Sequence, residues 1–441
     1  MYLIYSILYS VGLVLTAPYY WWRKGRAQGR RQWTERFGNV PFQEAEGGAI
    51  WIHAVSLGET LAVVGLVNEL QRAFPERRIY LSHVTPTGRE AGERRLPDIA
   101  GRFYVPLDWR WTVRRSLARI KPGLLVIAET EIWPNLLRCA RQSGAPVVMV
   151  NARLSKRSLR GYSLGRPFIR RVLDNVDEIC AQTEEDARRF RQLVKEPERV
   201  RVVGNLKFDA QPPQLGEFAR GLKTALRKSQ RGPVWVAAST MPGEETLVLE
   251  AWDTIRARYP QGLLLLAPRH PARFEEVSRE LRQAGRNFVR RTELPSEAQS
   301  LESRLASVSI VLLDTIGELA GIFEVADVVF MGGSLVPTGG HNLLEPAYWS
   351  KAITFGPHME NFRDIAKLFL EAGAAIQVRS PQELAHTAWL LENREARESM
   401  GAKARQVLEQ NSGATARTLE ILRKHLGGHA PSRRPPAREV K

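Results

Sequence analysis

Residues 49–70, AIWIHAVSLGETLAVVGLVNEL, contain the pattern that the rest of the chain repeats. The stretch opens with a nearly continuous apolar run and continues, from Ser56, with the apolar spacing of an amphipathic helix. This order is typical of a buried parallel strand followed by its crossover helix. The alternation recurs, and we expect further strands at 79–84, 124–129, 147–152, 234–240, 263–270, 309–315, 327–333 and 352–357.

The alternation is interrupted at AQPPQLGEF, residues 210–218, which has two prolines and the composition of a linker. A chain of 441 residues is also too long for one ordinary core. We therefore predict two Rossmann-like α/β domains, at 23–209 and 210–427. In such folds ligands bind at the carboxyl ends of the strands, so the chemistry is expected in strand-to-helix loops that face an interdomain cleft. The tail at 428–441 is rich in proline and arginine and is predicted to be disordered.

Residues 1–22 carry no charged side chain, and Arg23, Lys24 and Arg26 follow them directly. The length suffices to span a bilayer, and the basic flank would keep the rest of the chain in the cytoplasm. We expect a single N-terminal anchor in the inner (plasma) membrane. The alternative is a helix that lies in the membrane interface or packs against the protein.

The formal net charge of +17 favours a polyanionic partner: nucleic acid, anionic lipid or a phosphorylated substrate. The basic residues are dispersed and no nucleic-acid-binding motif is present, which argues against nucleic acid. A basic stretch at 153–171 could receive lipid phosphates or could be a solvated helix face. The two cysteines, Cys139 and Cys180, form neither a disulfide framework nor a zinc pattern.

Two motifs in the first half place carboxylates after predicted strands. Ser56 and Glu59 have the spacing of a helix-capping box, but a carboxylate at the end of a strand is also well placed as a general base. Glu129 and Glu131, in AETEIWPNLL, share a face of an extended chain. They could belong to a site or to an exposed loop that caps the next helix.

Two motifs in the second half suit a nucleotide. Arg269 and His270 end the four-leucine strand and offer cationic donors for a phosphate or a base. The segment MGGSLVPTGGHNLLEP, residues 331–346, is predicted to lead from a strand to a helix that opens near Asn342, whose free N–H groups would suit a leaving phosphate. Its alternative is an Asn342–Glu345 cap. Phosphate-binding P-loop and dinucleotide fingerprints are absent, as is the Asp-x-Asp pair that commonly holds a metal.

Taken together, these motifs resemble the 3-deoxy-D-manno-octulosonic acid (Kdo) transferase family. The resemblance covers nearly the whole chain and rests on the segments HAVSLGE (53–59), AETEIWPNLL (128–137), GNLKFD (204–209), LAPRHP (266–271), DTIGEL (314–319) and GGHNLLEP (339–346). It implies a GT-B fold with an acceptor domain followed by a donor domain. It further implies an inverting transfer of Kdo from CMP-Kdo to the lipid A precursor, at the inner membrane, without metal or other cofactor.

The resemblance also assigns roles. Glu59 matches the general base and Glu129 an essential acidic residue, and Ser56, Lys207 and His270 are further candidates inside family motifs. The positions that match contacts to CMP are Pro268, Arg269, Ile316, Gly317, Glu318, Asn342, Leu343, Leu344 and Glu345. Two other interpretations stay open: a GT-B enzyme that uses a UDP-sugar, such as an epimerase, and a membrane-bound nucleic-acid binder without catalysis.

Overall fold

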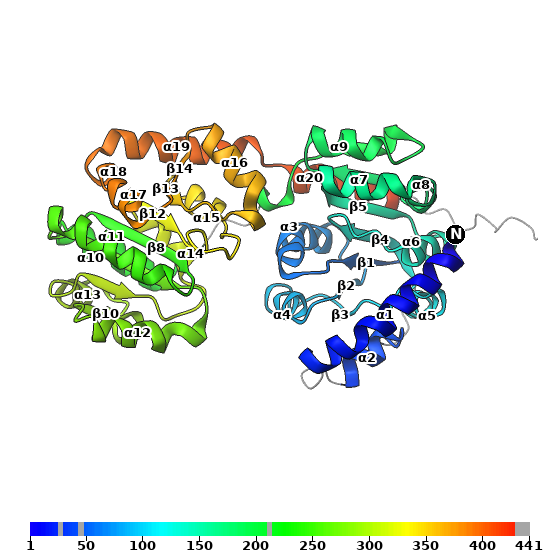
Figure 1. Ribbon diagram of the computed structural model, residues 1–441, viewed down its shortest axis with the longest axis horizontal. Helices are drawn as coiled ribbons and strands as arrows, with labels where there is room; N and C mark the ends of the chain where they lie inside the picture. Colours follow the sequence, from blue (N-terminus) through cyan, green and yellow to red (C-terminus); the bar gives the residue numbers. More distant parts are fainter. Residues whose placement is uncertain (25–29, 43–47, 210–213, 428–441) are drawn as a thin grey trace, which may run out of the picture. The chain divides into compact units, whose positions relative to one another are not determined.

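The computed structural model describes residues 1–24, 30–42, 48–209 and 214–427. They form two compact units, Met1–Gln211 with Asn411–Lys441, called unit 1, and Pro212–Gln410, called unit 2. Both are α/β units, as predicted (Figure 1). The change from one unit to the other falls inside the predicted linker, part of which lies outside the described residues, as does the predicted disordered tail.

Unit 1 is built on a parallel seven-stranded sheet in the order β3-β2-β1-β4-β5-β6-β7. The direction in which strands are added reverses between β1 and β4, so the topological switch point lies there. The strands are β1 (Ala49–His53), β2 (Ile79–His83), β3 (Gly101–Tyr104), β4 (Pro122–Ala128), β5 (Val147–Ala152), β6 (Glu178–Ala181) and β7 (Val200–Val202).

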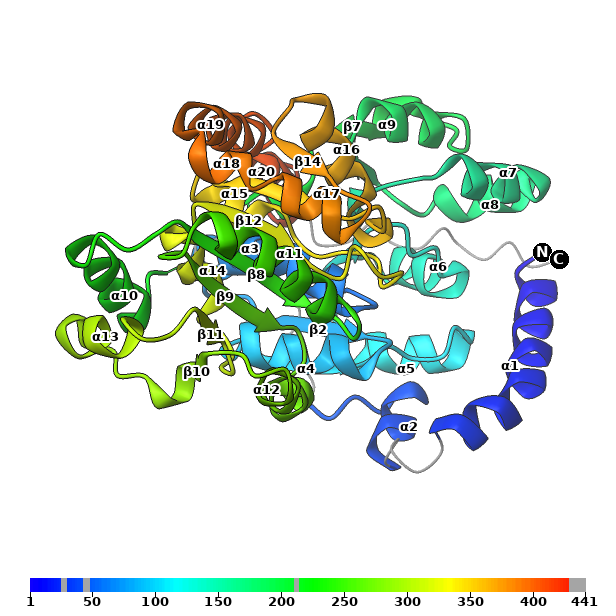
Figure 2. The ribbon, with the colours of Figure 1, turned by 60° about the vertical axis from the view of Figure 1, so that its left-hand side comes forward.

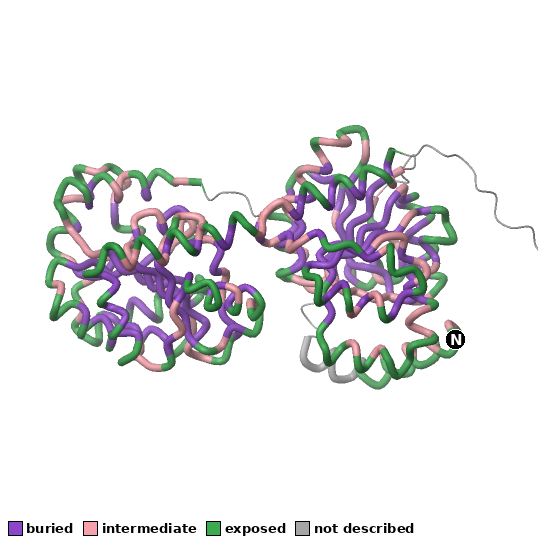
Figure 3. Tube along the Cα trace, turned by 90° about the horizontal axis from the view of Figure 1, so that it is seen from above, coloured by how far each residue is buried: buried purple, intermediate pink, exposed green. Residues whose placement is uncertain are grey.

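Helices cover both faces of this sheet, and the buried residues gather in the strands (Figure 3). One core joins the sheet to α3 and α20, and the other joins it to α5, α6, α8 and α9. The helices of unit 1 are α1 (Tyr2–Lys24), α2 (Arg30–Arg36), α3 (Leu57–Ala73), α4 (Pro86–Arg95), α5 (Arg110–Ile120), α6 (Pro134–Gln142), α7 (Lys156–Leu164), α8 (Arg166–Leu173), α9 (Glu184–Arg191) and α20 (Ala414–Leu426), with single turns η1 (Pro197–Arg199) and η2 (Leu206–Asp209).

Unit 2 repeats the design with the order β10-β11-β9-β8-β12-β13-β14, and its switch point lies between β8 and β12. Its core includes Trp235 and Trp252, whose rings stack 6.1 Å apart. The strands are β8 (Val234–Thr240), β9 (Leu263–Pro268), β10 (Phe288–Arg290), β11 (Ile310–Leu312), β12 (Val328–Met331), β13 (Ala352–Phe355) and β14 (Ala375–Gln377).

The helices of unit 2 pack on buried apolar strands, as those of unit 1 do. They are α10 (Glu217–Lys228), α11 (Glu244–Arg258), α12 (Phe274–Gln283), α13 (Ala298–Leu305), α14 (Leu319–Ile322), α15 (Leu344–Tyr348), α16 (Arg363–Glu371), α17 (Pro381–His386), α18 (Trp389–Glu392) and α19 (Arg394–Gln410), with single turns η3 (Pro271–Arg273), η4 (Arg291–Glu293), η5 (Phe323–Val325) and η6 (Glu360–Phe362).

All nine predicted strands are confirmed, several of them shorter than expected. Five further strands were not predicted: β3, β6, β7, β10 and β14. Each has only three or four residues, and each lies at or next to a sheet edge, where a strand needs less apolar sequence. Sequences such as GRFY and VRV give too little periodicity to be recognised.

Helix α1 lies along the outside of unit 1 (Figure 2). One face is bonded to the unit: the Tyr5 hydroxyl donates to Asp108 Oδ2 at 2.9 Å, and the Trp109 indole donates to Ser10 Oγ at 2.9 Å. The opposite face exposes aliphatic side chains at Leu3, Ile4, Ile7, Leu8, Val11, Val14 and Leu15. Within the part of the chain that the structure describes, no helix has the length and apolar character needed to cross a membrane.

The chain returns to unit 1 at its end, which differs from the predicted second domain at 210–427. Helix α20 buries Leu419, Leu422 and Leu426 in the core that it shares with α3. Asp209 fixes its start, because its carboxylate accepts the backbone N–H of Gly413 at 2.6 Å and that of Thr415. This long-range cap has no local sequence signal.

We expect Asp209→Ala to lower the free energy of unfolding of unit 1 by about 2 kcal/mol, because two backbone donors lose a charged acceptor. Thermal unfolding followed by circular dichroism measures the change. Asp98→Ala, at an exposed aspartate of the same unit, is the control and should stay within about 0.5 kcal/mol of the wild type. Equal effects of the two substitutions would contradict the capping role.

Candidate functional site

The predicted carboxylates lie on both sides of the switch point of unit 1. Glu59 follows β1 in the first turn of α3, and Glu129 follows β4, the strand that pairs with β1. In unit 2 the equivalent positions follow β8 and β12, and the segment Gly332–Gly333 is at one of them. Parallel α/β sheets bind ligands at this place, so the motifs occupy the expected end of each sheet.

Glu59 is both a helix cap and a buried acid. Its Oε2 accepts the Val55 N–H at 2.7 Å, its Oε1 accepts the Ser56 hydroxyl at 2.9 Å, and Ser56 is the N-cap of α3. The capping interpretation is therefore confirmed. Burial raises the pKa of Glu59, and the Glu129 charge raises it further, while the bonds from Val55 and Ser56 oppose the shift. The carboxylate is oriented and has increased basicity, which are properties of a general base.

Glu129 adopts the left-handed region, with φ of 55°, which is rare for a residue with a side chain. Its backbone N–H donates to the Val150 carbonyl at 2.9 Å. Its Oε1 lies 3.6 Å from the Lys207 ammonium in η2, and its Oε2 lies 3.6 Å from Arg153 Nε. The strained backbone thus directs the carboxylate toward two cations, and strain of this kind is often found at functional sites.

The structure brings together residues that the sequence left in separate motifs. The charges of Glu129 and Lys207 both act on Glu59, and the charges of Glu59 and Glu129 act on Glu131. These four residues, Glu59, Glu129, Glu131 and Lys207, are here called the carboxylate cluster. Arg153 was not singled out as a member. The sequence placed it only in the basic stretch at 153–171, directly after the strand at 147–152, which is β5, the neighbour of β4.

A buried polar network under the cluster was also missed. His53, at the end of β1, shares the Ser82 hydroxyl with the Trp51 indole, at 2.9 and 2.8 Å. Burial lowers the pKa of His53 to about 3 and that of His83 to about 4, so both rings are neutral at physiological pH. The network therefore supports the end of the sheet without adding charge to it.

In unit 2, one buried carboxylate organises the loop after β12. Glu244, at the start of α11, accepts the backbone N–H groups of Met241, Gly333, Ser334 and Leu335 at 2.5 to 2.9 Å. Gly332 packs so closely on β8 that a Cβ atom would lie 2.8 Å from the Ser239 carbonyl oxygen. The first glycine pair therefore serves internal packing: the Gly332 N–H donates to the Ala238 carbonyl at 2.7 Å, and the Gly333 N–H donates to Glu244.

The second glycine pair leads into a shorter helix than predicted. Gly339 and Gly340 have φ of 94° and 72°, and α15 begins only at Leu344 and has five residues. Asn342 lies before it, accepting the Leu344 N–H at 3.2 Å and donating to Glu345 at 3.4 Å. The local Asn–Glu interaction is thus present. The predicted helix start near Asn342 is thus corrected to Leu344, and so short a helix has little macrodipole to offer a phosphate.

The cationic donors of unit 2 stay available at the end of β9. Pro268 is the last residue of this strand, and the side chains of Arg269 and His270 are exposed beyond it. The Arg269 N–H donates to the Thr240 carbonyl at 3.0 Å, which ties the loop to β8. Burial, together with the charges of Arg269 and His270, lowers the pKa of the nearby His341 to about 4. The positive charge of Arg269 thus lies near the neutral imidazole of His341.

The predicted segment 316–318 has a fixed acid and an exposed apolar residue. Glu318 is held by the Arg291 guanidinium at 2.9 Å and by the Thr315 hydroxyl. Ile316 is 70% exposed, and Gly317 has φ of 92°. Arg291 was not predicted, and its guanidinium lies 3.8 Å from the centre of the Phe218 ring. With Glu318 paired internally, Ile316 and the Gly317 backbone are left to contact a ligand.

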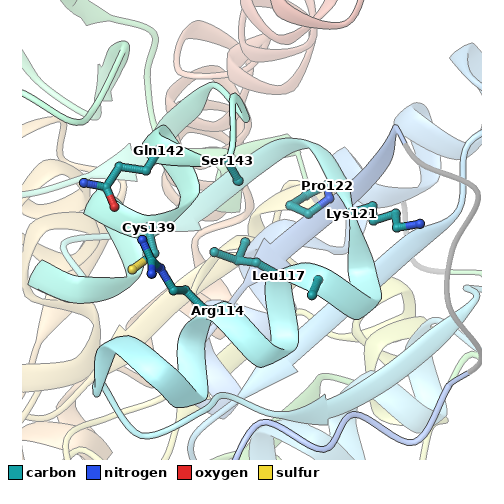
Figure 4. A pocket seen from close by; sticks show the side chains of 8 residues that line it. Arg114, Leu117, Lys121, Pro122, Cys139, Gln142 and Ser143 are labelled. Atoms are coloured by element: carbon teal, nitrogen blue, oxygen red, sulfur yellow. The ribbon is translucent and has the colours of Figure 1, made fainter. Parts of the chain in front are cut away.

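One pocket lies away from all of these residues. It is lined by Arg114, Leu117, Lys121 and Cys139, among others (Figure 4). Lys121 and Pro122 are at the amino end of β4, whereas Glu129 follows its carboxyl end, so this pocket belongs to the opposite edge of the sheet. Among the described residues, no three acidic, histidine or cysteine side chains are grouped to hold a metal ion.

The fold agrees with known structures. UDP-GlcNAc 2-epimerase from Neisseria meningitidis, solved with UDP-GlcNAc, superposes with a TM-score of 0.54 over 85% of this chain and all of its own, at 15% sequence identity. MurG from Acinetobacter baumannii superposes with a TM-score of 0.50 over 86% of this chain and 99% of its own, at 14% identity. At such identities the likeness concerns the fold alone, which is GT-B.

Sequence comparison identifies the family. Residues 31–210 match the family model of 3-deoxy-D-manno-octulosonic-acid transferase (kdotransferase). The 3-deoxy-D-manno-octulosonic acid transferase of Haemophilus influenzae is 34% identical over 90% of this chain and 92% of its own, and that of Bordetella pertussis is 36% identical over 95% and 99%. The chain therefore belongs to the Kdo transferase family and is a glycosyltransferase.

Proposed function

We propose that this enzyme transfers Kdo from CMP-Kdo to a hydroxyl group of the lipid A precursor, lipid IVA, in lipopolysaccharide synthesis. The reaction proceeds with inversion and without a metal ion. The observation that carries the proposal is the carboxylate cluster: a buried, oriented Glu59 next to Glu129, whose carboxylate is accompanied by Lys207. A single base beside an acceptor site suits one direct displacement, and one displacement inverts the anomeric centre.

Glu59 takes the proton from the attacking acceptor hydroxyl. The N–H of Val55 and the hydroxyl of Ser56 hold its carboxylate in place, so little reorganisation is needed. Its raised pKa makes it a stronger base than an exposed glutamate. Glu129 and Lys207 keep an ordered pair of opposite charges near the reacting centre, which supports charge development in the transition state.

The donor nucleotide is assigned to unit 2. As the sugar–phosphate bond breaks, negative charge grows on the phosphate of CMP. Arg269 supplies positive charge and His270 an N–H donor at the end of β9. Ile316 offers an apolar surface for the pyrimidine ring, and the Gly317 backbone allows close approach. Asn342 and Glu345 complete the expected contacts, whereas the side chains of Leu343 and Leu344 are buried.

Purified enzyme incubated with CMP-Kdo and lipid IVA in detergent tests the proposal directly. Mass spectrometry of the lipid should show added Kdo, and the number of units can be counted. UDP-N-acetylglucosamine is the matched donor control and should give no product and no epimer. Turnover of the UDP-sugar with none of CMP-Kdo would replace the proposal by that of another GT-B enzyme.

We expect Glu59→Gln to reduce kcat on the order of a hundredfold or more, because the base is lost while the shape of the side chain is kept. Wild-type kcat should fall as the pH drops through the raised pKa of Glu59, since only the carboxylate accepts a proton. CMP binding, followed by calorimetry, should not change. Glu69→Gln on the same helix is the control, and near-wild-type turnover of folded Glu59→Gln would exclude Glu59 as the base.

Transfer should continue in excess EDTA at close to its untreated rate. The reason is that Arg269 supplies the positive charge that a metal would otherwise bring to the leaving phosphate, and His270 offers an N–H donor beside it. The assay compares initial rates of Kdo transfer before and after chelation and after readdition of magnesium. A rate abolished by EDTA and restored by magnesium would contradict metal independence.

We also propose that α1 attaches the enzyme to the inner membrane by lying in the interface, with both units in the cytoplasm. Tyr5 and Ser10 bind the first half of the helix to unit 1, and the opposite face exposes only aliphatic side chains and one glycine between Leu3 and Leu15. Such an arrangement is typical of an interfacial helix, whereas spanning would remove Tyr5 from the buried Asp108.

Basic side chains flank this apolar face. Tyr2 of α1 stacks edge-on against Phe168 of α8, 5.6 Å between ring centroids, so α8 adjoins the start of α1. Helices α7 and α8 expose the cations Lys156, Arg157, Arg160, Arg166 and Arg171. Each basic residue near an anionic bilayer adds about 1 kcal/mol of attraction. The combination fits the anionic lipids of the membrane and the phosphates of the acceptor.

Replacing Ile4, Leu8 and Leu15 together with glutamine should weaken binding to vesicles of phosphatidylglycerol and phosphatidylethanolamine at least tenfold. Each fully buried aliphatic side chain contributes about 2 kcal/mol, and all three are lost from the exposed face. Turnover of detergent-dispersed acceptor should not change. Co-sedimentation measures binding, and Tyr5→Phe, on the bonded face, is the control. Unchanged vesicle binding of the triple variant would exclude α1 as the attachment.

A further inference from the structure

The loop between β4 and α6 carries a third carboxyl group, on Glu131, to which the proposed mechanism gives no role. Glu131 lies two residues after Glu129, and the charges of Glu59 and Glu129 both act on it, so it belongs to the carboxylate cluster. Its Oε2 accepts the indole N–H of Trp133 at 2.9 Å. This bond orients the carboxyl group from inside its own loop.

The surroundings of Glu131 are apolar on the protein side. Ile132 and Trp133 pack against the core of unit 1, and so does Tyr162 of α7. The Trp133 ring meets the neutral His53 ring edge-on, 6.1 Å between centroids. Among the described residues, Glu131 has no cationic partner, whereas Glu129 lies 3.6 Å from both Lys207 and Arg153. The two neighbouring glutamates of one loop therefore have opposite environments.

Burial, the Glu59 charge and the Glu129 charge raise the pKa of Glu131 to about 7, and the Trp133 bond opposes the shift only in part. The titratable groups that face it are Glu59 on α3, Glu129 in its own loop and Tyr162 on α7; the Glu131 charge contributes to the raised pKa of Tyr162. Lys207, the cation of the cluster, is paired with Glu129. Below neutral pH, Glu131 thus keeps its proton.

We propose that Glu131 is an acceptor-binding residue whose protonated carboxyl group donates a hydrogen bond to a hydroxyl or ether oxygen of the acceptor sugar, beside Glu59. Trp133 occupies Oε2, which leaves Oε1 to carry the proton and face the ligand. Glu131 exchanges no proton with the substrate in this role; it positions the sugar whose hydroxyl Glu59 deprotonates. The inference rests on the proposed Kdo transfer and adds a residue to its acceptor site.

This role predicts a particular pH dependence. Activity requires Glu59 without its proton and Glu131 with its proton, so kcat/KM for the acceptor should rise and then fall with pH, the fall beginning near pH 7. Because Glu59 and Glu131 interact, the rise and the fall of the pH profile both report the ionisation of the two acids together. Glutamine at position 131 has the same shape and a permanent N–H donor, so it should replace the protonated acid and not titrate.

The test compares Glu131→Gln, Glu131→Ala and the wild type, with CMP-Kdo and detergent-dispersed lipid IVA as substrates. We expect Glu131→Gln to keep wild-type activity at pH 6 within about threefold and to lose the alkaline fall. Glu131→Ala should raise KM for the acceptor about tenfold, with KM for CMP-Kdo unchanged. Glu90→Gln, an exposed glutamate on α4, is the control and should keep the wild-type profile.

Infrared spectroscopy gives a readout that does not depend on turnover. The C=O band of a protonated carboxyl group should titrate near pH 7 in the wild type and be missing from Glu131→Gln. An alkaline fall that persists in Glu131→Gln, an unchanged acceptor KM in folded Glu131→Ala, or an absent band in the wild type would overturn the inference. Failure of the proposed function differs from these outcomes, because the wild type itself would then transfer no Kdo.

Discussion

The pairing of β1 with β4 is the constraint on which the chemistry of unit 1 depends. The two parallel strands run in register, Ile52 beside Val126 and His53 beside Ile127, so their carboxyl ends come out together. Glu59 follows one end and Glu129 and Glu131 follow the other, although about 70 residues separate them in the sequence. A crossover in any other order would place these side chains on different parts of the sheet edge.

Three carboxyl groups at one sheet end would repel each other if their surroundings were alike. The protein gives each of these carboxyl groups different partners. Glu129 has Lys207 and Arg153, Glu59 has neutral donors from Val55 and Ser56, and Glu131 has the Trp133 indole. Environments that push neighbouring acids apart in pKa allow one to act as an anion and another to keep its proton.

The same principle of internal pairing explains unit 2. Glu244 accepts hydrogen bonds from the backbone after β12, and Arg291 forms an ion pair with Glu318, so these charged groups stabilise loops. Arg269, His270 and Ile316 are exposed at this end of the sheet. A nucleotide would therefore meet a cation, an imidazole and an apolar surface, with the loops already held in shape. Preorganised donors of this kind need little reorganisation during reaction.

The sequence by itself determined the two α/β units, nine of the strands, the family and the candidate residues Glu59, Glu129, Lys207 and Arg269, because apolar runs and strand-end motifs are local signals. Only the tertiary structure decided which of these residues act as one group. The strand order places β1 next to β4, and Asp209 caps α20 and so attaches it to unit 1. The hydrogen bonds of Tyr5 and Ser10 attach α1 to the surface of the same unit. These contacts join residues far apart in the chain, so no local pattern encodes them.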